Sequence, residues 1–372
     1  MVWFPPGARA VRRMDEETRL IHVGADPRRL VRTVGPPIQK GSTVLLPSAA
    51  ALYDDDAYVT YGRQGLATHE ALCEGLAELE GAQAVVLYPS GVAALSGAML
   101  AVLQAGDAIR VADTCYRPTR RFCDKVLKRY GVSVEYYDPR LPPEAVFESA
   151  PASLRLVVLE SPGSLSMEMQ DVAAITREAR ARGVMTLADN TWAAGLYFKP
   201  LAHGVDISVQ ALTKYVGGAS DVFMGSAATL DPAIGRKLAD GINHLGWAVS
   251  GEEAYLMLRG LRTLPVRLAQ HDASARKLAE WLRARAEVGQ VLHPALPGAP
   301  GHDLWKRDFT GACGLFAFTL AGGSDAAADA FLDALDVFGL GFSWGGFESL
   351  AITCDPQFAC RRHRFEYGGP MI

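Results

Sequence analysis

The sequence of 372 residues lacks the features that mark several large classes of protein. It has no basic excess, because 37 Lys and Arg residues stand against 41 Asp and Glu residues. A protein that binds nucleic acid usually carries such an excess or a basic stripe. It also has no apolar run of about 18 residues, which a transmembrane helix needs, and no apolar core of a signal peptide near its start. We therefore expect neither nucleic acid nor a membrane among its partners.

The cysteines are too scattered for a metal site or a disulfide framework. No two of them form a CxxC pair, the spacing typical of zinc sites and redox motifs. The six stand at positions 73, 115, 123, 313, 354 and 360. This usage is typical of a reducing compartment, so we expect a cytoplasmic protein without a bound metal.

The composition predicts a well-packed protein of about two domains. Hydrophobic residues make up 49% of the chain and charged residues 21%, which excludes disorder as the main state. No repeat of fixed period is visible. We divide the chain into an N-terminal extension and arm (1–65), a large domain (66–265) and a small C-terminal domain (266–372).

The large domain alternates short apolar runs with segments of helical period. Residues 67–80 space Leu72, Leu76 and Leu79 on one helical face, and Gly81 ends that helix. Further helices are predicted at 92–103, 118–130, 171–182 and, as one mainly helical stretch, 231–261. Strands are predicted at 84–88, 108–112, 133–137, 154–159, 184–188 and 207–211. Continuous apolar strands separated by helices predict an α/β fold with a mostly parallel sheet between flanking helices.

The small domain reads as α+β. Helical patterns at 268–285 and 324–335 enclose a strand-like run at 314–320, and Met371-Ile372 resembles the beginning of another strand.

Three polar segments follow apolar runs, at the sheet edge where α/β proteins bind their ligands. Ser90-Gly91 turns a predicted strand into a helix, whose first N–H groups would suit a phosphate; the same pair can be a plain turn. Asp189 places a carboxylate just past a strand, where it can hold a ring nitrogen protonated or simply cap a turn. Lys214 follows a strand and precedes a Gly pair. It is either structural or a desolvated amine suited to Schiff-base chemistry.

The three segments together say more than any one of them. A phosphate-binding turn, an acid for a ring nitrogen and a Schiff-base lysine are the groups that a protein needs to bind pyridoxal 5'-phosphate (PLP). The sequence therefore predicts a PLP site.

A family resemblance extends this prediction to nearly the whole chain, from about residue 18 to residue 372. The chain resembles the Cys/Met-metabolism family of fold-type I PLP-dependent enzymes. The segments that carry the resemblance are Tyr61-Gly-Arg63, Leu159-Glu-Ser-Pro-Gly-Ser164, Asp189-Asn-Thr-Trp-Ala-Ala-Gly195, Thr213-Lys214-Tyr, Arg259-Gly-Leu-Arg-Thr263, His293-Pro-Ala-Leu-Pro297 and Phe342-Ser-Trp-Gly-Gly-Phe-Glu-Ser349.

The resemblance implies roles for individual residues of the cofactor site. Lys214 matches the lysine that carries PLP, and Asp189 matches the acid on the pyridine nitrogen. Tyr116 matches the tyrosine that stacks on the ring and assists catalysis. Without the family context, Tyr116 would be an ordinary half-buried aromatic. The residues that match the phosphate site are Gly91, Val92 and Thr213.

Two further pairs of residues carry over from the family. Tyr61 and Arg63 match a pair that reaches the phosphate from a neighbouring subunit, which implies an obligatory dimer within a tetramer. On their own, Tyr61 would read as a half-buried aromatic and Arg63 as half of a surface ion pair. Ser343 and Trp344 match residues that line the substrate pocket.

The substrate-side residues resemble the branch of the family that acts at Cβ. Members that act at Cγ carry Glu at the position of Phe342 and Leu at that of Trp344, and Asn-Pro where this chain has Ser164-Leu165. The resemblance therefore implies a carbon–sulfur lyase of transsulfuration and methionine biosynthesis. Its reaction would be β-elimination of the amino acid L-cystathionine. The alternatives are a broader cysteine-S-conjugate β-lyase or cysteine desulfhydrase, or a catalytically poor PLP-binding protein with a regulatory or assembly role.

Two departures from the family bear on the site. Ala211 stands where many relatives have a Ser hydroxyl near the phosphate. The family also continues past residue 372 with an arginine that binds the substrate α-carboxylate, a task for which arginine is the best suited residue. We expect either a truncated small domain or an incomplete pocket.

Overall fold

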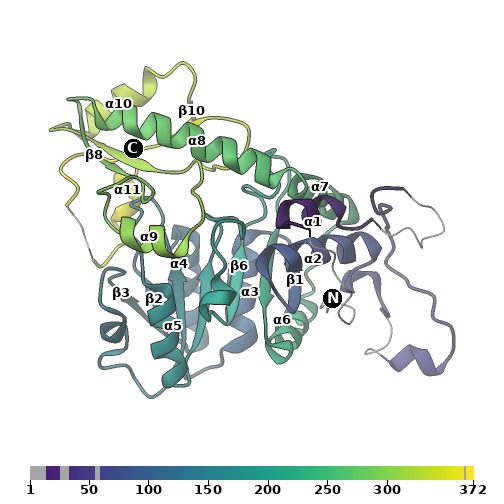
Figure 1. The fold of residues 1–372 in the computed structure, drawn as a ribbon. Coiled ribbons are helices and arrows are strands. Elements are labelled where there is room, and N and C mark those ends of the chain that lie inside the picture. Colours follow the sequence, from purple (N-terminus) through teal and green to yellow (C-terminus); the bar gives the residue numbers. More distant parts are fainter. Residues whose placement is uncertain (1–13, 26–32, 55–58, 364–365) are drawn as a thin grey trace. The chain divides into compact units, whose positions relative to one another are not determined.

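The computed structural model (Figure 1) describes residues 14–25, 33–54, 59–363 and 366–372. Residues 1–13, 26–32 and 55–58 of the predicted extension and arm lie outside the described residues. The chain forms two compact units. The first unit is Met1–Val102 with Asp206–Pro265, and the second is Leu103–Val205 with Val266–Ile372. The division at residues 65 and 265 stays a prediction.

The first unit is built on three strands and their helices. Strand β7 (Gly225–Thr229) lies between β1 (Ala84–Tyr88) and β6 (Ile207–Gln210) and runs antiparallel to both. Helices pack on these strands: α3 on all three, α2 on β1, and α6 on β1 and β7. The helices of this unit are α1 (Glu16–His22), α2 (Ala67–Glu80), α3 (Gly91–Val102), α6 (Pro232–Leu245) and α7 (Gly251–Leu261).

Helix α2 shows how the sequence dictates these elements. Leu72, Leu76 and Leu79 lie on its buried face, as their spacing predicts. The helix ends at Gly81, whose φ of 65° is the left-handed conformation that glycine adopts most readily. The predicted range of this helix is confirmed at both ends.

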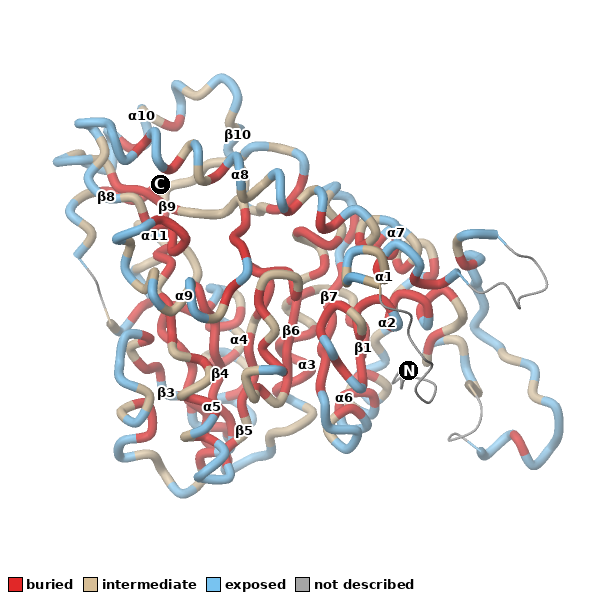
Figure 2. The backbone as a smooth tube through the Cα atoms, viewed as in Figure 1, coloured by how far each residue is buried: buried red, intermediate tan, exposed pale blue. Residues whose placement is uncertain are grey.

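The second unit contains a fully parallel set of strands, in the order β5-β4-β2-β3. Their bounds are β2 (Ala108–Ala112), β3 (Ser133–Tyr137), β4 (Leu154–Glu160) and β5 (Met185–Asp189). Helix α4 (Arg117–Lys125) follows β2, and α5 (Val172–Ala181) connects β4 to β5 and packs on β5. Figure 2 shows that residues along these strands are buried. The predicted α/β class is confirmed.

The rest of the second unit mixes helices with short strands. The long helix α8 (Leu264–Arg283) begins in the last two residues of the first unit and leads to an antiparallel pair, β8 (Val288–Leu292) with β9 (Ala317–Leu320). Met371 forms a bridge to Thr319 of β9, so the prediction of a strand start there is confirmed. The remaining elements are α9 (His302–Asp308), α10 (Asp325–Asp333), β10 (Gly339–Leu340), β11 (Leu350–Ala351) and α11 (Asp355–Phe358).

Some predicted bounds differ from the structure. The helix predicted at 118–130 stops at Lys125, and a separate 3-10 turn covers Leu127–Tyr130. The helical stretch predicted at 231–261 is two helices, because Gly246 ends α6 and Ser250 caps α7. Strands β7 and β8 were not predicted. Among the described residues, no helix has the length and apolar character needed to cross a membrane.

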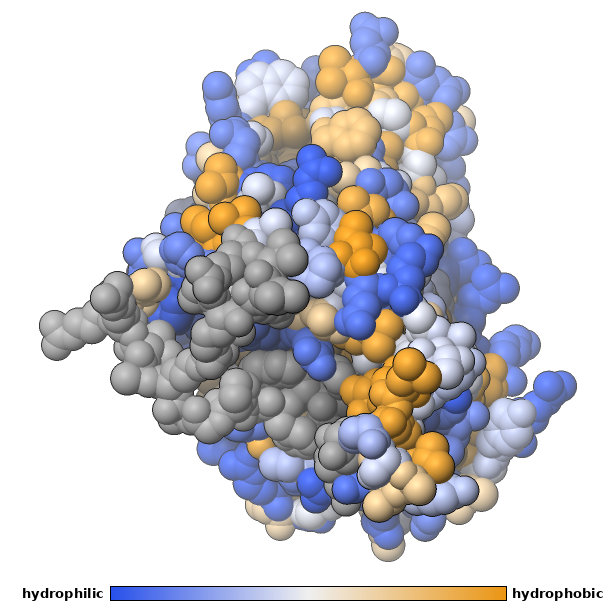
Figure 3. Space-filling view, turned by 90° about the vertical axis from the view of Figure 1, so that its right-hand side faces the viewer, coloured by the Kyte–Doolittle hydropathy of each residue, from blue (hydrophilic) through white to orange (hydrophobic). Residues whose placement is uncertain are grey.

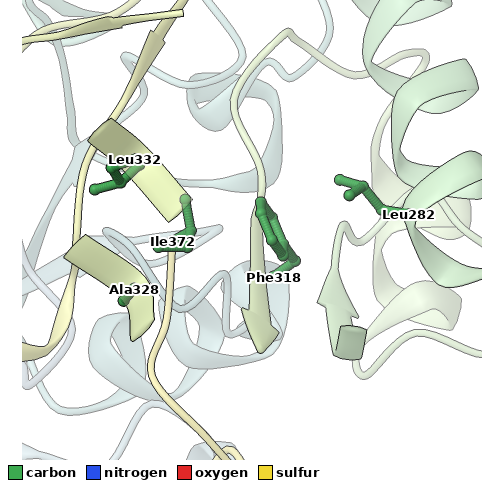
Figure 4. Close-up of a cluster of buried hydrophobic side chains, with 5 residues drawn as sticks. All are labelled: Leu282, Phe318, Ala328, Leu332 and Ile372. Carbon is green, nitrogen blue, oxygen red and sulfur yellow. The ribbon is translucent and has the colours of Figure 1, made fainter. Parts of the chain in front are cut away.

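A small apolar core holds the later part of the second unit together (Figure 4). Phe318 of β9 lies between Ile372 and Leu282 of α8, and two residues of α10 complete the cluster. Its buried members are Leu282, Phe318, Ala328, Leu332 and Ile372. This core ties two helices to β9 and the last residues of the chain.

We predict that Phe318→Ala lowers the free energy of unfolding by about 3–5 kcal/mol, since it removes a buried aromatic ring and leaves a cavity. Urea unfolding followed by circular dichroism measures the change. Phe347→Ala is the size-matched control, because Phe347 is 84% exposed while Phe318 is 8% exposed. Equal effects of the two substitutions would refute this core.

Candidate cofactor and catalytic site

The turn after β1 begins helix α3. Ser90 caps the helix: its Oγ accepts a bond from Ala93 N at 3.1 Å, and its carbonyl accepts from Ala94 N at 3.0 Å. The N–H groups of Gly91 and Val92 belong to the first turn, where a helix offers no acceptor of its own. They need an acceptor from outside the helix, and a phosphate suits that place.

Gly91 allows the turn to approach the segment after β6. A Cβ added at Gly91 would lie 2.4 Å from Ala211 Cβ and 2.9 Å from Ala211 Cα, so a side chain does not fit there without a shift. Two residues on, Thr213 is fixed to the residue before β7: its Oγ1 donates to Met224 O at 3.2 Å and accepts from Met224 N at 3.0 Å. Half-buried Lys214 follows. The first unit thus brings the predicted phosphate and lysine residues together around Ala211.

Tyr61 and Arg63 are also in the first unit, on the arm before α2, and both are exposed. Gly62 between them sits so tightly on the chain at Gly41 that a Cβ would lie 1.8 Å from Gly41 O. The Arg63 guanidinium lies 5.7 Å from the Tyr61 ring centre and donates to Asn243 O at 2.9 Å. The arm places the pair side by side at the surface.

The same arm carries three large apolar side chains at the surface. Val34, Leu45 and Tyr53 are nearly fully exposed. Figure 3 views the molecule from the side of this arm and shows hydrophobic residues at its surface.

In the second unit, Asp189 is the last residue of β5. Its Oδ1 accepts bonds from the backbone N of Thr191 at 3.1 Å and from the Thr191 hydroxyl at 2.5 Å. Those bonds hold the carboxylate in one orientation at the end of the strand. An acid held in this way suits a protonated ring nitrogen.

Tyr116 stands immediately before α4, and its side chain is 40% exposed. Burial raises the pKa of its phenol above the ordinary value, and the charges of Asp189 and Glu160 raise it further. The phenol therefore keeps its proton at neutral pH, which suits a stacking partner or a proton donor rather than a base.

Glu160, to which the sequence analysis gave no role, lies beside these two residues. It ends β4 and pairs in register with Asp189. Its Oε2 accepts a bond from Tyr116 N at 2.7 Å. The signal was present in the sequence, since Glu160 ends an apolar strand just as Asp189 does.

The predicted substrate residues Ser343 and Trp344 are half-buried in the loop between β10 and β11. Phe342 beside them is exposed. Across the described part of the chain, no cluster of three His, Cys, Asp or Glu side chains is arranged to hold a metal ion.

The residues present fit PLP. The first unit offers a helix N-terminus opened by a glycine, with a lysine three residues beyond Ala211. The second offers a fixed acid and a tyrosine that stays neutral. Anion-binding amides, an amine and an acid are the groups that bind the phosphate, the aldehyde and the ring nitrogen of this cofactor.

Comparisons with known proteins agree. Residues 17–361 match the model of the Cys/Met metabolism PLP-dependent enzymes. A relative named putative cystathionine beta-lyase, from Rhizobium johnstonii, is 48% identical over 90% of this chain and 85% of its own length. Cystathionine beta-lyase MetC of Escherichia coli is 39% identical over 92% of this chain and 88% of its own length.

The fold agrees as well. A crystal structure of cystathionine gamma synthase from Xanthomonas oryzae matches with a TM-score of 0.85 and 33% identity, over 91% of this chain and 86% of that one. The predicted PLP-enzyme fold is therefore confirmed, and so is the cofactor. The chain belongs to the Cys/Met metabolism family of PLP-dependent enzymes.

Proposed function

We propose that this enzyme is a carbon–sulfur lyase that cleaves L-cystathionine by β-elimination. L-Cystathionine and water give homocysteine, pyruvate and ammonia. The observation that carries the choice of Cβ is Phe342, which is 83% exposed in the loop that holds Ser343 and Trp344. An apolar ring at this position offers no carboxylate to hold the distal amino group of a substrate. The relatives named cystathionine beta-lyase support the same choice.

Each residue has a defined task in this reaction. PLP, when bound, supplies an electron sink for the electrons left at Cα after deprotonation. Lys214 would hold the cofactor through its amine, and that amine, when free, would remove the Cα proton. The Asp189 carboxylate keeps a proton on the ring nitrogen. The neutral Tyr116 phenol would stack on the ring and hold its plane.

The Cβ–S bond then breaks. The sulfur leaves as the thiolate of homocysteine and takes a proton. The remaining three-carbon enamine is hydrolysed to pyruvate and ammonia.

We further propose that the active enzyme is a dimer within a tetramer, located in the cytosol. Exposed Tyr61 and Arg63 support shared sites, because a cation and a phenol suited to a phosphate project from the surface of this arm. The apolar side chains of the arm support its burial against a neighbouring subunit.

We predict that Gly91→Ala weakens PLP binding by about tenfold or more, equal to about 1.4 kcal/mol, because the new Cβ displaces the turn. Absorbance titration with PLP measures the dissociation constant. Ala211→Gly should leave affinity nearly unchanged. The double variant Gly91→Ala/Ala211→Gly should recover part of the loss, since it removes the 2.4 Å contact while the 2.9 Å contact remains. Unchanged affinity of Gly91→Ala would place the phosphate elsewhere.

We predict that the purified protein converts L-cystathionine to equal amounts of pyruvate and free thiol. Its kcat/KM for L-cystathionine should exceed that for L-cysteine at least about tenfold, since the pocket must bind the distal part of the larger substrate. Lys214→Ala should lower kcat by roughly a thousandfold or more, whereas exposed Lys237→Ala should not. A preference for cysteine would instead indicate a desulfhydrase. Borohydride reduction that attaches the cofactor to a lysine other than Lys214 would refute the site.

A third prediction tests the shared site. Arg63→Ala should weaken PLP binding, because the phosphate loses a cation. Mixed oligomers of Arg63→Ala and Lys214→Ala subunits should regain activity, since one site in each hybrid dimer has both residues intact. Coupled lyase assays before and after subunit exchange measure this. Exchange shown by mass spectrometry without recovered activity contradicts the proposal.

A further inference from the structure

Two carboxyl groups end adjacent parallel strands of the second unit. Glu160 is the last residue of β4, Asp189 is the last residue of β5, and the two are partners in the ladder. Side chains at paired positions of parallel strands point to the same face of the sheet. Glu160 is 9% exposed. The structure thus puts two acids on one face where little water reaches the first of them.

The carboxyl group of Glu160 joins two segments of the site. Oε2 accepts the bond from Tyr116 N at 2.7 Å, and Oε1 is bonded to the Ser164 hydroxyl. Tyr116 begins the segment that leads into α4, and Ser164 follows β4. Glu160 therefore ties the main chain at the proposed stacking residue to the end of β4.

Arginine lies close to this group without pairing with it. The Arg361 guanidinium donates to Ser164 O and to the Ser166 hydroxyl, each at 2.6 Å. It holds the segment that carries the hydroxyl bonded to Glu160. The two donors to the Glu160 carboxyl itself, within the described residues, are a peptide N–H and a hydroxyl, and both are neutral.

Burial and a like charge both favour the neutral form of Glu160. The charged and titratable groups that face it are Asp189 on β5, Cys115 and Tyr116 after β2, and Arg361. Loss of water raises the pKa of Glu160 to about 8, with the Asp189 charge as the next cause, while the bonds from Ser164 and Tyr116 and the charge of Arg361 oppose the rise. The Cys115 thiol has its own pKa raised well above the ordinary value, first by burial, and stays uncharged. Two adjacent acids seldom ionise together when one of them is buried.

We propose that Glu160 is a positioning residue of the site, a neutral carboxylic acid that fixes the main chain at Tyr116 and leaves Asp189 as the anion on this face. This rests on the proposed function, in which Tyr116 and Asp189 contact the cofactor. The proton that makes Glu160 neutral lies in the hydrogen bond between Glu160 Oε1 and the Ser164 hydroxyl. Either of these two oxygens can be the donor in that bond. The bond from Tyr116 N requires an acceptor on Glu160 and no charge.

The first test asks whether the site depends on the hydrogen bonds of Glu160 or on its charge. Glu160→Gln keeps an acceptor for Tyr116 N and a partner for Ser164, and it is neutral at every pH. Glu160→Ala removes both bonds. We expect Glu160→Gln to bind PLP within about threefold of the wild type, with the same circular dichroism band of the bound cofactor, which reports the setting of its ring. We expect Glu160→Ala to lose about tenfold in affinity and most of that band.

The second test reads the proton directly, in the full-length protein after PLP is removed. The infrared carbonyl band of a protonated carboxylic acid should be present at pH 6, disappear with a midpoint near pH 8, and be absent in Glu160→Gln. Asp189→Asn should keep the band and move its midpoint about half a unit or more to lower pH, because it removes the neighbouring negative charge. With PLP bound, the positive ring nitrogen should also lower the midpoint.

The inference is overturned by either of two results. One is a wild-type spectrum at pH 6 that does not differ from that of Glu160→Gln. The other is a folded Glu160→Ala variant with unchanged PLP affinity and circular dichroism. If Glu160→Ala does not fold, the infrared comparison of the wild type with Glu160→Gln still tests whether Glu160 is protonated. Failure of the wild type to cleave cystathionine would refute the proposed function alone, because neither readout uses the substrate.

Discussion

The parallel register of β2, β4 and β5 is the constraint on which the site in the second unit depends. Each strand is an apolar segment that has no stable place outside a sheet, so hydrogen bonding and burial fix the strands against one another. The register then determines which residues meet at their carboxyl ends. It pairs Glu160 with Asp189 and leaves the segment from Asp113 to Tyr116 within hydrogen-bonding reach of both β4 and the residues after it. A slip of one residue would send each of these side chains to the opposite face.

The buried Asp113 carboxylate at this edge has one partner that is near in the sequence and one from a distant part of the chain. Asp113 and Arg120 form an ion pair whose side chains are almost completely buried, and the Arg120 guanidinium lies 3.7 Å from the Tyr136 ring centre. The second carboxylate oxygen of Asp113 accepts from His363 N at 2.5 Å. A buried pair of this kind adds little net stability compared with an apolar replacement, but removing one partner costs about 3–5 kcal/mol. Its effect is to allow one arrangement of the chain just before Tyr116.

Much of the fold was predictable from the sequence because its strands are continuous apolar runs. The bounds of β1, β2 and β3 match the predicted ranges, and those of β4, β5 and β6 differ by one residue at one or both ends. Strand β7 was not predicted because Gly225-Ser-Ala-Ala-Thr229 has small side chains without a clear pattern. Its pairing between β1 and β6 depends on the sheet rather than on its own sequence. Strand β8 was not predicted because Gly289 and Gln290 interrupt its apolar residues.

The residues of the site were predictable to a similar extent. Asp189 and Lys214 stand out because each puts a charge near the end of an apolar strand, and the family resemblance added Tyr116 and the phosphate residues. Glu160 follows the same rule and was overlooked, since its role is visible only when the register brings it beside Asp189. The contacts of Arg361 and His363 were beyond prediction. They join residues 195 to 250 positions apart, and no local pattern in the sequence encodes such pairing.

The bond from His363 to Asp113 spans 250 residues, and this separation has a consequence for the time course of synthesis. At typical ribosomal rates of about 5–20 residues per second, roughly 10 to 50 s pass between the appearance of the two partners. During that interval the segment before Tyr116 has its local partner Arg120 but not its final restraint. A newly made chain therefore completes this part of the site only after residue 363 has left the ribosome, and the cofactor cannot meet the finished segment before then.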